Sequence, residues 1–289
     1  MKALYSGVSG MRSHQTKMDV IGNNIANVNT YGFKTQRATF RDVYYQTLKT
    51  PGEPGDDRGG TNASQVGYGS QVGSVDTIQT ISGYSPTNKQ TDIYINGDGF
   101  LAVENSSGDI LYTRLGALNF DKAGNLVDVN GSRIIGYDNA DGNAIKTNAD
   151  GMIDWTETIE VSPDVIKIDN YEEYKNITIN SDGSITAIDT DDKIVTIGAI
   201  PVYKIPNQDA LILEGNSYYS RGNNAGEPII NSPGSGGTGA LVTGGLEMSN
   251  VDLANEFSDM IITQRGFQAN TKIISVVDQM LEELVNLKR

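Results

Sequence analysis

The sequence holds few side chains that could carry out acid–base or metal chemistry. Its 289 residues include a single histidine, His14, and no cysteine. The absence of cysteine excludes disulfides, thiolate metal sites and cysteine catalysis. A Ser-His-Asp arrangement would need His14 exposed beside a nucleophile, and nothing near it in the sequence suggests one. We therefore interpret His14 as a packing or intersubunit residue and expect no catalytic residue.

Carboxylates are abundant, with 36 Asp and Glu residues, so counting alone leaves a glycosidase pair open. Most of them lie in Asp-Gly and Asp-rich turns, where local hydrogen bonds explain their presence. Two Asn-Ala-Asp-Gly tetrads, at residues 139–142 and 148–151, match calcium loops only in part, because Ala140 falls where an EF-hand needs an oxygen ligand. No phosphate-binding loop or dinucleotide fingerprint is present. We expect no metal and no cofactor.

The charge of the chain is strongly negative and unevenly distributed, with a formal net charge of −14. Residues 1–50 hold seven Lys or Arg and two Asp or Glu, whereas residues 250–289 hold four and six. The long stretch between them is therefore the acidic part, which we interpret as a solvated outer surface. This balance gives no support to nucleic-acid binding.

No segment has the pattern of a signal peptide or a membrane span. Lys2 is not followed by the apolar run of about 7–15 residues that a signal peptide needs. The longest apolar-rich run, Ile194–Ile205, is interrupted by Gly198 and Pro201 and is too short for a bilayer. From these residues alone we expect a soluble chain that makes no membrane contact.

Apolar residues at both ends of the chain repeat with the period of helices that pair with other helices. In residues 4–28, heptad sites a and d are held by Leu4, Gly7, Met11, His14, Met18, Ile21, Ile25 and Val28. Six of these eight sites are apolar, which predicts a helix. Similar spacings recur near the C-terminus through Leu253, Phe257, Met260, Phe267, Ile274, Val277, Leu281 and Leu284. We expect a long helix there, which follows a capping box at Ser249–Asp252 and runs to about Leu287.

Two terminal helices with one narrow apolar seam each cannot bury those seams alone. One interpretation is that each helix packs on a sheet as an ordinary core helix. We favour the other interpretation, in which the two helices pair as a coiled coil used for self-assembly. The residues expected at the assembly interface are Leu4, Met11, Met18, Ile21, Ile25, Val28, Phe257, Met260, Phe267, Ile274, Val277, Leu281 and Leu284.

The middle of the chain has the pattern of a mainly β domain. From about Val72, short apolar segments alternate with turns at intervals of about ten residues, which favours a sandwich or partial barrel. Within Thr91–Asn105 we expect a hairpin in which residues 93–95 pair with residues 100–104 across the turn Asn96–Gly99.

The patterns together predict three parts of the chain. They are a terminal helical assembly core (residues 1–30 and 247–289), a connector and glycine-rich hinge (residues 31–71 and 233–246), and an outer β domain (residues 72–232). Within the connector, Ala38–Leu48 fits either a short helix or an extended arm. The next stretch, Thr50–Gly73, fits a long loop or a hairpin.

Three stretches resemble the bacterial flagellar hook and rod protein family. Asp19–Lys34, DVIGNNIANVNTYGFK, is similar to that family's N-terminal signature, and Leu246–Arg289 is similar to its C-terminal signature. The block from Asp98 to Tyr137 resembles the family's outer β domain. The resemblance implies a structural subunit that self-assembles into the tubular, flexible hook and transmits torque from rod to filament. It also implies that the paired helices line the inside of the tube and the β domain forms its outer wall.

The resemblance further implies partners and a location. The expected partners are further copies of the chain in a helical homopolymer, the distal rod protein, the hook cap, the hook–filament junction proteins and the flagellar type III export apparatus. The location would be extracellular, in the flagellum, reached without a cleaved signal peptide. Related hook proteins often insert a further domain near Asp138–Tyr174, and this segment is too short for a complete one.

Hook and distal rod proteins are close relatives, and the sequence contains features similar to both. Gly7–Met11, Gly73–Thr77 and Ile262–Asn270 look more like the hook, whereas the short chain and Tyr45–Gly52 look more like the rod. We favour the hook and keep the distal rod as the alternative. A third hypothesis is a secreted β-domain enzyme or carbohydrate-binding module. It lacks a catalytic constellation and leaves both seams unexplained; activity or binding by residues 72–232 alone would support it.

Overall fold

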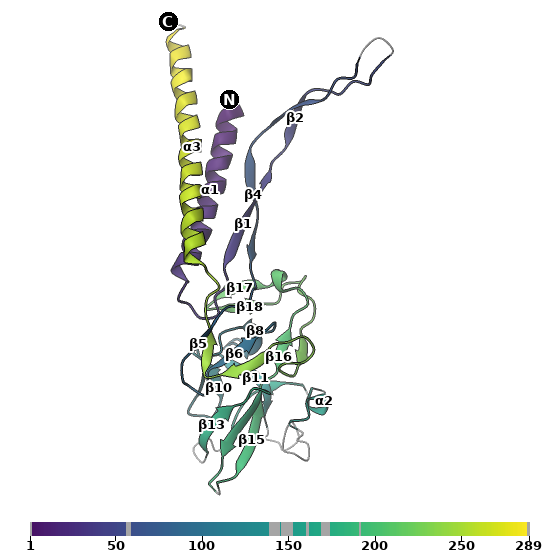
Figure 1. The fold of residues 1–289 in the computed structure, drawn as a ribbon, viewed down its shortest axis with the longest axis vertical. Coiled ribbons are helices and arrows are strands. Elements are labelled where there is room, and N and C mark those ends of the chain that lie inside the picture. Colours follow the sequence, from purple (N-terminus) through teal and green to yellow (C-terminus); the bar gives the residue numbers. More distant parts are fainter. Residues whose placement is uncertain are drawn as a thin grey trace. The chain divides into compact units, whose positions relative to one another are not determined.

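The structure is a computed structural model that describes residues 2–55, 59–138, 145, 153–159, 162–168, 174–190 and 192–287. Both Asn-Ala-Asp-Gly tetrads, and much of the segment Asp138–Tyr174, lie outside the described residues. The chain divides into two units (Figure 1). The helical unit consists of Met1–Val28, Thr35–Ile78 and Val251–Arg289, and the β unit of Asn29–Lys34 and Gln79–Asn250.

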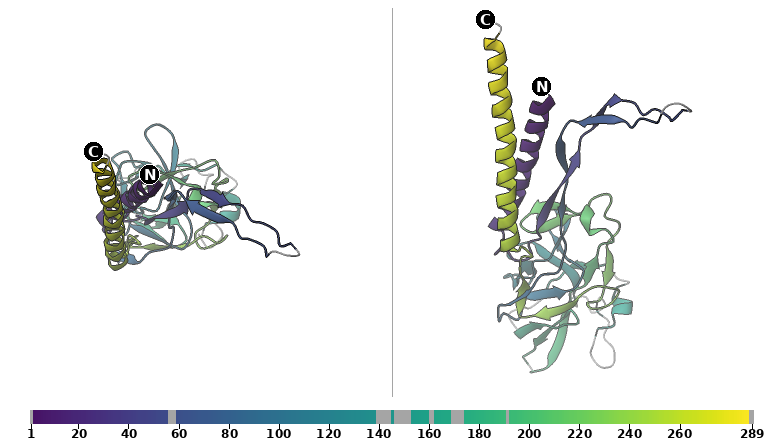
Figure 2. Two further views of the ribbon diagram at one scale, coloured as in Figure 1. Left: turned by 90° about the horizontal axis from the view of Figure 1, so that it is seen from above. Right: turned by 45° about the horizontal axis from the view of Figure 1, so that its top comes forward.

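The helical unit contains the two long helices expected from the heptad patterns. Helix α1 spans Lys2–Ala26 and helix α3 spans Leu253–Asn286, and they lie side by side in both views of Figure 2. The cap of α3 differs from the predicted box. Asp252 is the N-cap, and its carboxylate accepts hydrogen bonds from the backbone N–H groups of Ala254 at 2.9 Å and Asn255 at 3.4 Å. No helix in the described part of the chain is long and apolar enough to cross a membrane.

The helical unit also contains an antiparallel ribbon with two arms. The first arm consists of β1 (Gln36–Asp42) and β2 (Tyr45–Lys49), and the returning arm consists of β3 (Ser64–Gly67) and β4 (Ser70–Thr77). Strand β1 pairs with β4, and β2 pairs with β3. The extended interpretation of Ala38–Leu48 and the hairpin interpretation of Thr50–Gly73 are therefore the ones the structure adopts. Helix α1 packs against β1 and β4, so the ribbon covers part of the helix surface.

The β unit is built around one antiparallel sheet, in the order β13-β14-β15-β11-β7-β8-β18-β17, which β9, β10 and β12 join beside β11. The strands are β7 (Leu101–Glu104), β8 (Ile110–Thr113), β9 (Leu118–Phe120), β10 (Leu126–Asp128), β11 (Arg133–Asp138), β12 (Asp164–Val165), β13 (Lys175–Ile179), β14 (Ser184–Ile188), β15 (Ile194–Ala199), β17 (Ile212–Gly215) and β18 (Tyr218–Ser220). The expectation of a mainly β domain with helices at both termini is confirmed.

Three further strand pairs and two short helices belong to the described part of the β unit. Strand β16 (Val202–Lys204) pairs with β19 (Ile229–Asn231), β6 (Ile93–Asn96) with β20 (Ala240–Thr243), and β5 (Tyr84–Pro86) with β21 (Gly245–Glu247). Helix α2 spans Trp155–Thr158, and a 3₁₀ helix spans Gln208–Ala210. The largest cluster of buried apolar side chains lies under the main sheet and includes Ile93, Leu101, Val103, Leu118, Ile134 and Ile185.

The predicted hairpin across Asn96–Gly99 is wrong in its pairing. Both strands form, but β6 pairs with β20, and β7 pairs with β8 and β11. The turn itself is present, because Gly97 and Gly99 have φ values of 148° and 133°. A Cβ on Gly97 would lie 2.4 Å from the Cα of Gly239, so a distant segment passes against the turn. The partner strand from residues 240–243 therefore replaces the local one.

Candidate assembly interface

The seam between α1 and α3 is antiparallel. The side chain of Ile274 lies against Gly7, that of Asn270 against Gly10, and that of His14 against Gly266. Residue numbers fall along α3 as they rise along α1, so the start of α1 lies beside the later part of α3. The helix pairing expected from the sequence is therefore present within one chain, in this orientation.

Glycines permit the close approach of the two helices. A Cβ would lie 3.3 Å from Ile274 Cγ1 if placed on Gly7, 2.9 Å from Asn270 Nδ2 if placed on Gly10, and 2.6 Å from the His14 ring if placed on Gly266. Gly266 therefore has a packing reason inside a helix, where glycine otherwise costs about 1 kcal/mol relative to alanine.

His14 packs inside this seam. Its ring meets the ring of Phe40 edge-to-face at 5.7 Å between centroids, and its Nδ1 is buried without a hydrogen-bond partner among the described residues. Burial lowers the pKa of His14, and the positive charge of Lys17 lowers it further. The neutral imidazole is therefore the favoured form, which fits a packing residue.

Polar contacts join the seam to the ribbon. Asn24 is 1% exposed; its amide donates to the Gln36 carbonyl at 2.8 Å and to Glu256 Oε1 at 3.0 Å, and its Oδ1 accepts from the Gln36 N–H at 3.0 Å. Lys17 Nζ lies 3.0 Å from Asp259 Oδ2. Burial raises the pKa of Glu256, and the hydrogen bonds from Asn24 and Thr35 oppose that shift. One amide thus links α1, α3 and β1.

The predicted interface residues fall into two groups. The buried or partly buried ones are Leu4, Met11, Met18, Ile21, Ile25, Val28, Met260, Phe267, Ile274 and Val277. The exposed ones are Phe257, Leu281 and Leu284, at 50%, 40% and 62%. The sequence prediction of the interface considered apolar residues and therefore missed Ser13, Asn24 and Thr263, which are polar and at most 3% exposed. Thr263 lies three residues after Met260 and four before Phe267, so its spacing alone could have placed it in the seam.

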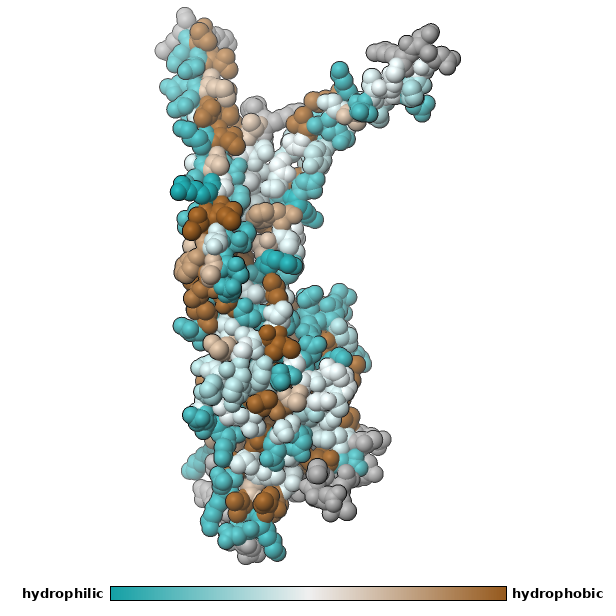
Figure 3. All heavy atoms as spheres, viewed as in Figure 1, coloured by the Kyte–Doolittle hydropathy of each residue, from teal (hydrophilic) through white to brown (hydrophobic). Residues whose placement is uncertain are grey.

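A second apolar surface on α3 flanks the α1 seam, with Ile273 at its edge near Gly7, and we call it the outer stripe. Its members are Ile262, Ile273, Val276, Met280, Leu284 and Leu287. Their spacings of 11, 3, 4, 4 and 3 place them on one side of the helix. Each is between 41% and 82% exposed, and Figure 3 shows apolar side chains gathered along this helix. A single chain leaves this surface in water.

A groove of about 320 Å³ lies between α1 and the ribbon. Its lining residues are Tyr5, Val8, Ser9, Arg12, Ser13, Thr16, Val43, Ser70, Gln71 and Val72. Tyr5 is 68% exposed and Val8 is 38% exposed. The helical unit thus presents an open concave surface in addition to the outer stripe. Both surfaces suit the burial of apolar side chains from another molecule.

Comparison with known protein families agrees with these features. Residues 4–34 match the model described as flagella basal body rod protein. Residues 94–187 match that of the flagellar hook protein FlgE/F/G D1 domain, and residues 242–287 match the flagellar basal body rod FlgEFG protein C-terminal model. The three matches cover α1, a large part of the β unit and α3.

Individual relatives match along the whole chain. The chain is 42% identical to the flagellar basal-body rod protein FlgG of Bacillus subtilis over 290 residues, with both chains fully covered. It is 33% identical to FlgG of Borreliella burgdorferi, over all of this chain and 99% of the relative. It is 28% identical to the flagellar hook protein FlgE of the same organism over 441 residues, again with full coverage of both.

The chain belongs to the flagellar hook and basal-body rod protein family. It is a structural subunit of the hook or rod of the bacterial flagellum, where subunits of this family assemble with other flagellar components. The relatives described above are structural proteins of the flagellum, not enzymes.

Proposed function

We propose that the chain polymerises into a tube through its helical unit. The observation that carries this proposal is the outer stripe of α3, whose side chains at positions such as 262 and 284 are about two-thirds exposed in a single chain. A subunit with no partner would keep this surface in contact with water at a cost of about 25 cal/mol per Å². A second copy of the chain in the polymer would cover both the outer stripe and the groove beside α1.

In this proposal the two terminal helices pair as a coiled coil inside the tube and the β domain forms its outer wall. The antiparallel α1–α3 seam supports such pairing. The predicted division into an assembly core (1–30, 247–289), a connector and hinge (31–71, 233–246) and an outer β domain (72–232) is part of the same proposal. Strands β20 and β21 lie at the end of the hinge segment and pair with β6 and β5, so this part of the hinge segment completes the outer β domain.

The rod and the hook are the two positions along the flagellar axis at which the chain is expected. The alignment with the Bacillus rod protein spans 290 residues, whereas the alignment with the Borreliella hook protein spans 441, so that hook protein contains long segments absent from this chain. These lengths and identities favour the rod, and the hook favoured by the sequence motifs is compatible with the same family. Electron microscopy of polymer from the purified chain separates them: straight tubes support the rod, and curved tubes support the hook.

The remaining expectations follow from family membership. We propose that the chain leaves the cell through the flagellar type III export apparatus without a cleaved signal peptide. In the assembled flagellum its neighbours would be the distal rod protein, the hook cap and the hook–filament junction proteins, according to its position. The acidic central segment is consistent with an outer surface that contacts water.

The proposed assembly role is tested by single charges in the helical unit. We expect Met18→Asp and Leu284→Asp to abolish sedimentable polymer while the β unit stays folded. A buried apolar side chain contributes about 1.5–3 kcal/mol, an unpaired buried charge costs more, and the loss recurs at every subunit. Met18 tests the α1 seam, and Leu284 tests the outer stripe.

The matched control is Gln15→Asp, which places the same charge on an exposed position of α1. We expect this variant to sediment as polymer like the unmodified chain. If Leu284→Asp polymerises normally, the outer stripe is not an assembly surface. If Met18→Asp polymerises normally as well, the helical unit is not the core of the polymer.

A further inference from the structure

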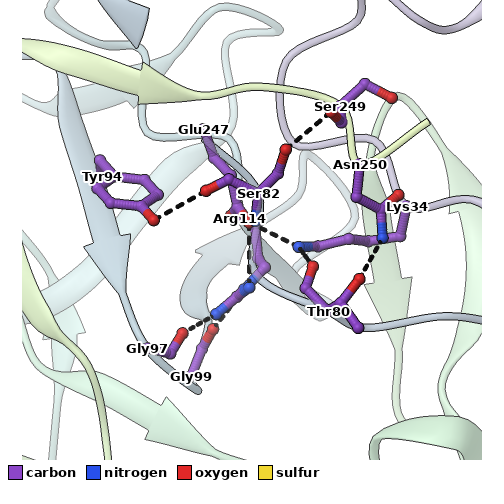
Figure 4. A network of polar contacts seen from close by, with 10 residues as sticks. All are labelled: Lys34, Thr80, Ser82, Tyr94, Gly97, Gly99, Arg114, Glu247, Ser249 and Asn250. Carbon is purple, nitrogen blue, oxygen red and sulfur yellow. Dashed lines mark hydrogen bonds and ion pairs between the residues drawn. The ribbon is translucent and has the colours of Figure 1, made fainter. Parts of the chain in front are cut away.

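A buried group of charges lies inside the β unit, and we call it the Glu247 cluster: Lys34, Arg114 and Glu247. These residues are 2%, 4% and 1% exposed. Glu247 Oε1 accepts from Lys34 Nζ at 2.6 Å and from Arg114 Nη1 at 3.3 Å (Figure 4). The backbone N–H of Ser82 donates to the same oxygen at 3.1 Å. One carboxylate oxygen therefore receives donors from three separate chain segments.

Further hydrogen bonds extend from the cluster to the same segments. Lys34 Nζ also donates to the Thr80 carbonyl at 2.7 Å, and the Gly32 N–H donates to the Glu247 carbonyl at 2.9 Å. Ser82 Oγ donates to the Ser249 carbonyl at 2.8 Å, and Asn250 Nδ2 donates to Thr80 Oγ1 at 2.9 Å. The segments 29–34, 79–82 and 247–250 are thus bonded to one another.

Arg114 anchors these segments to the rest of the β unit. Its Nε donates to the Gly99 carbonyl at 3.0 Å, and its Nη2 donates to the Gly97 carbonyl, both in the turn after β6. Its guanidinium also lies 5.6 Å from the centre of the Phe100 ring. The position of Arg114 is therefore determined by contacts that do not involve the connecting segments.

The cluster coincides with the places where the chain passes from one unit to the other. These passages follow Val28, Lys34, Ile78 and Asn250. Each passage lies within four residues of a residue that belongs to the cluster or is hydrogen-bonded to it. These residues are Gly32, Lys34, Thr80 and Glu247. Every segment that leads into α1, the ribbon or α3 thus leaves the β unit beside Glu247.

Stability alone does not account for such a group. Buried ion pairs can often be replaced by apolar residues without loss of stability, because removing charges from water is costly. Here burial and the charge of Arg114 lower the pKa of Lys34, and Glu247 opposes that shift. What the charges add, and apolar side chains cannot, is directional bonding of several segments to one atom.

We propose that Lys34, Arg114 and Glu247 are positioning residues that fasten the connecting segments to the β unit, so that these segments do not detach when the polymer carries load. This inference rests on the proposed assembly function for the load. The fastening itself is a property of the single chain. The fastening of the segments and its role under load are therefore tested in separate experiments.

The first experiment measures amide hydrogen exchange at residue resolution in the full-length, unpolymerised chain. For Glu247→Gln we expect exchange at Gly32, Ser82 and Met248 to rise by about tenfold or more, as for loss of hydrogen bonds to a charged group. Amides of β7 and β8 should keep their protection. Unchanged exchange at the three amides, or an equal rise across the β unit, overturns the proposal.

The matched control is Tyr218→Phe, which removes a buried hydroxyl bonded to Asp128 and, at 3.0 Å, to Ser132. It disturbs a polar network of the β unit that touches none of the connecting segments. We expect it to leave exchange at Gly32, Ser82 and Met248 unchanged. A rise at these amides equal to that of Glu247→Gln would mean that any loss of stability loosens them, and would overturn the proposal.

A milder variant keeps the test valid if Glu247→Gln does not fold. Ser82→Ala removes only the hydroxyl bond to the Ser249 carbonyl. We expect faster exchange at Met248 and unchanged exchange at Gly32. No change at Met248 counts against the proposal.

The second experiment measures function in cells that carry Glu247→Gln. We expect normal amounts of sedimentable polymer together with reduced motility. Normal motility in a variant whose connecting amides exchange faster overturns the role under load. Loss of polymer in the seam variants, by contrast, bears only on the assembly function.

Discussion

At the scale of single residues, the seam between α1 and α3 depends on small and polar groups as much as on apolar ones. Gly266 leaves room for the His14 ring, and Asn24 joins three elements through one amide. Polar groups buried in such a place fix the register, because an unpaired donor or acceptor there would cost about 1–3 kcal/mol. The heptad pattern alone is compatible with several registers.

Two glycine substitutions test the close approach at Gly266. Gly22→Ala should stabilise the helical unit by up to about 1 kcal/mol, because alanine favours helix and a Cβ at Gly22 meets nothing within 4 Å. Gly266→Ala should lack this gain and should destabilise, because its Cβ would lie 2.6 Å from His14. Urea unfolding followed by circular dichroism at 222 nm measures both. Equal stabilisation by the two variants would show that the helices do not meet at Gly266.

At the scale of elements, α3 is longer than the partner that covers it. Gly7 lies against Ile274, and α1 begins only five residues before Gly7, at Lys2. Helix α1 therefore covers α3 only to a few residues beyond Ile274. The last two turns of α3 contain Leu281, Leu284 and Val285, which are 40%, 62% and 69% exposed. Leu281 belongs to the predicted seam by its spacing, and it lies seven residues beyond Ile274, which places it past the described start of α1.

Removal of residues 279–287 tests what this end of α3 does. The truncated chain should keep the α1–α3 seam and unfold in urea close to the midpoint of the full chain, since these side chains are largely exposed. It should lose polymer, because much of the outer stripe is gone. Sedimentation and circular dichroism give the two readings. Normal polymer from the truncated chain would assign assembly to the remainder of the helical unit.

At the scale of the whole molecule, the β unit is assembled from residues far apart in the sequence. Strands β20 and β21 pair with β6 and β5, and Glu247 pairs with Lys34 across more than 200 residues. The region with the clearest strand and turn signals, residues 72–232, lacks both of these strands and both of these charges. It is therefore an incomplete version of the β unit.

Two fragments test this completeness. Residues 29–250 contain every segment of the β unit and should fold with a cooperative thermal transition. Residues 72–232 leave Arg114 buried without its carboxylate, a loss of about 3–5 kcal/mol, and leave β5 and β6 unpaired. We expect this fragment to be unfolded or to melt at a much lower temperature. Equal melting temperatures would show that the terminal segments contribute little to the β unit.

The sequence by itself determined the elements and the family. The heptad spacing placed both helices to within a few residues, and Gly-containing turns placed the strands, because these signals arise from neighbours along the chain. The family signatures at Asp19–Lys34 and Leu246–Arg289 identified the class of protein. Ten of the thirteen expected interface residues lie at least partly buried, and their role in assembly stays a prediction.

Only the tertiary structure decided which strands pair and in which orientation the two terminal helices meet. The turn Asn96–Gly99 marked a reversal of the chain but not its partner, since pairing of β6 with residues 240–243 depends on contacts across about half the chain. The outer stripe depends on the tertiary structure, because α1 covers the neighbouring face of α3 and leaves these side chains exposed. The Glu247 cluster had no sequence signal, because Lys34, Arg114 and Glu247 are ordinary surface residue types until folding removes them from water.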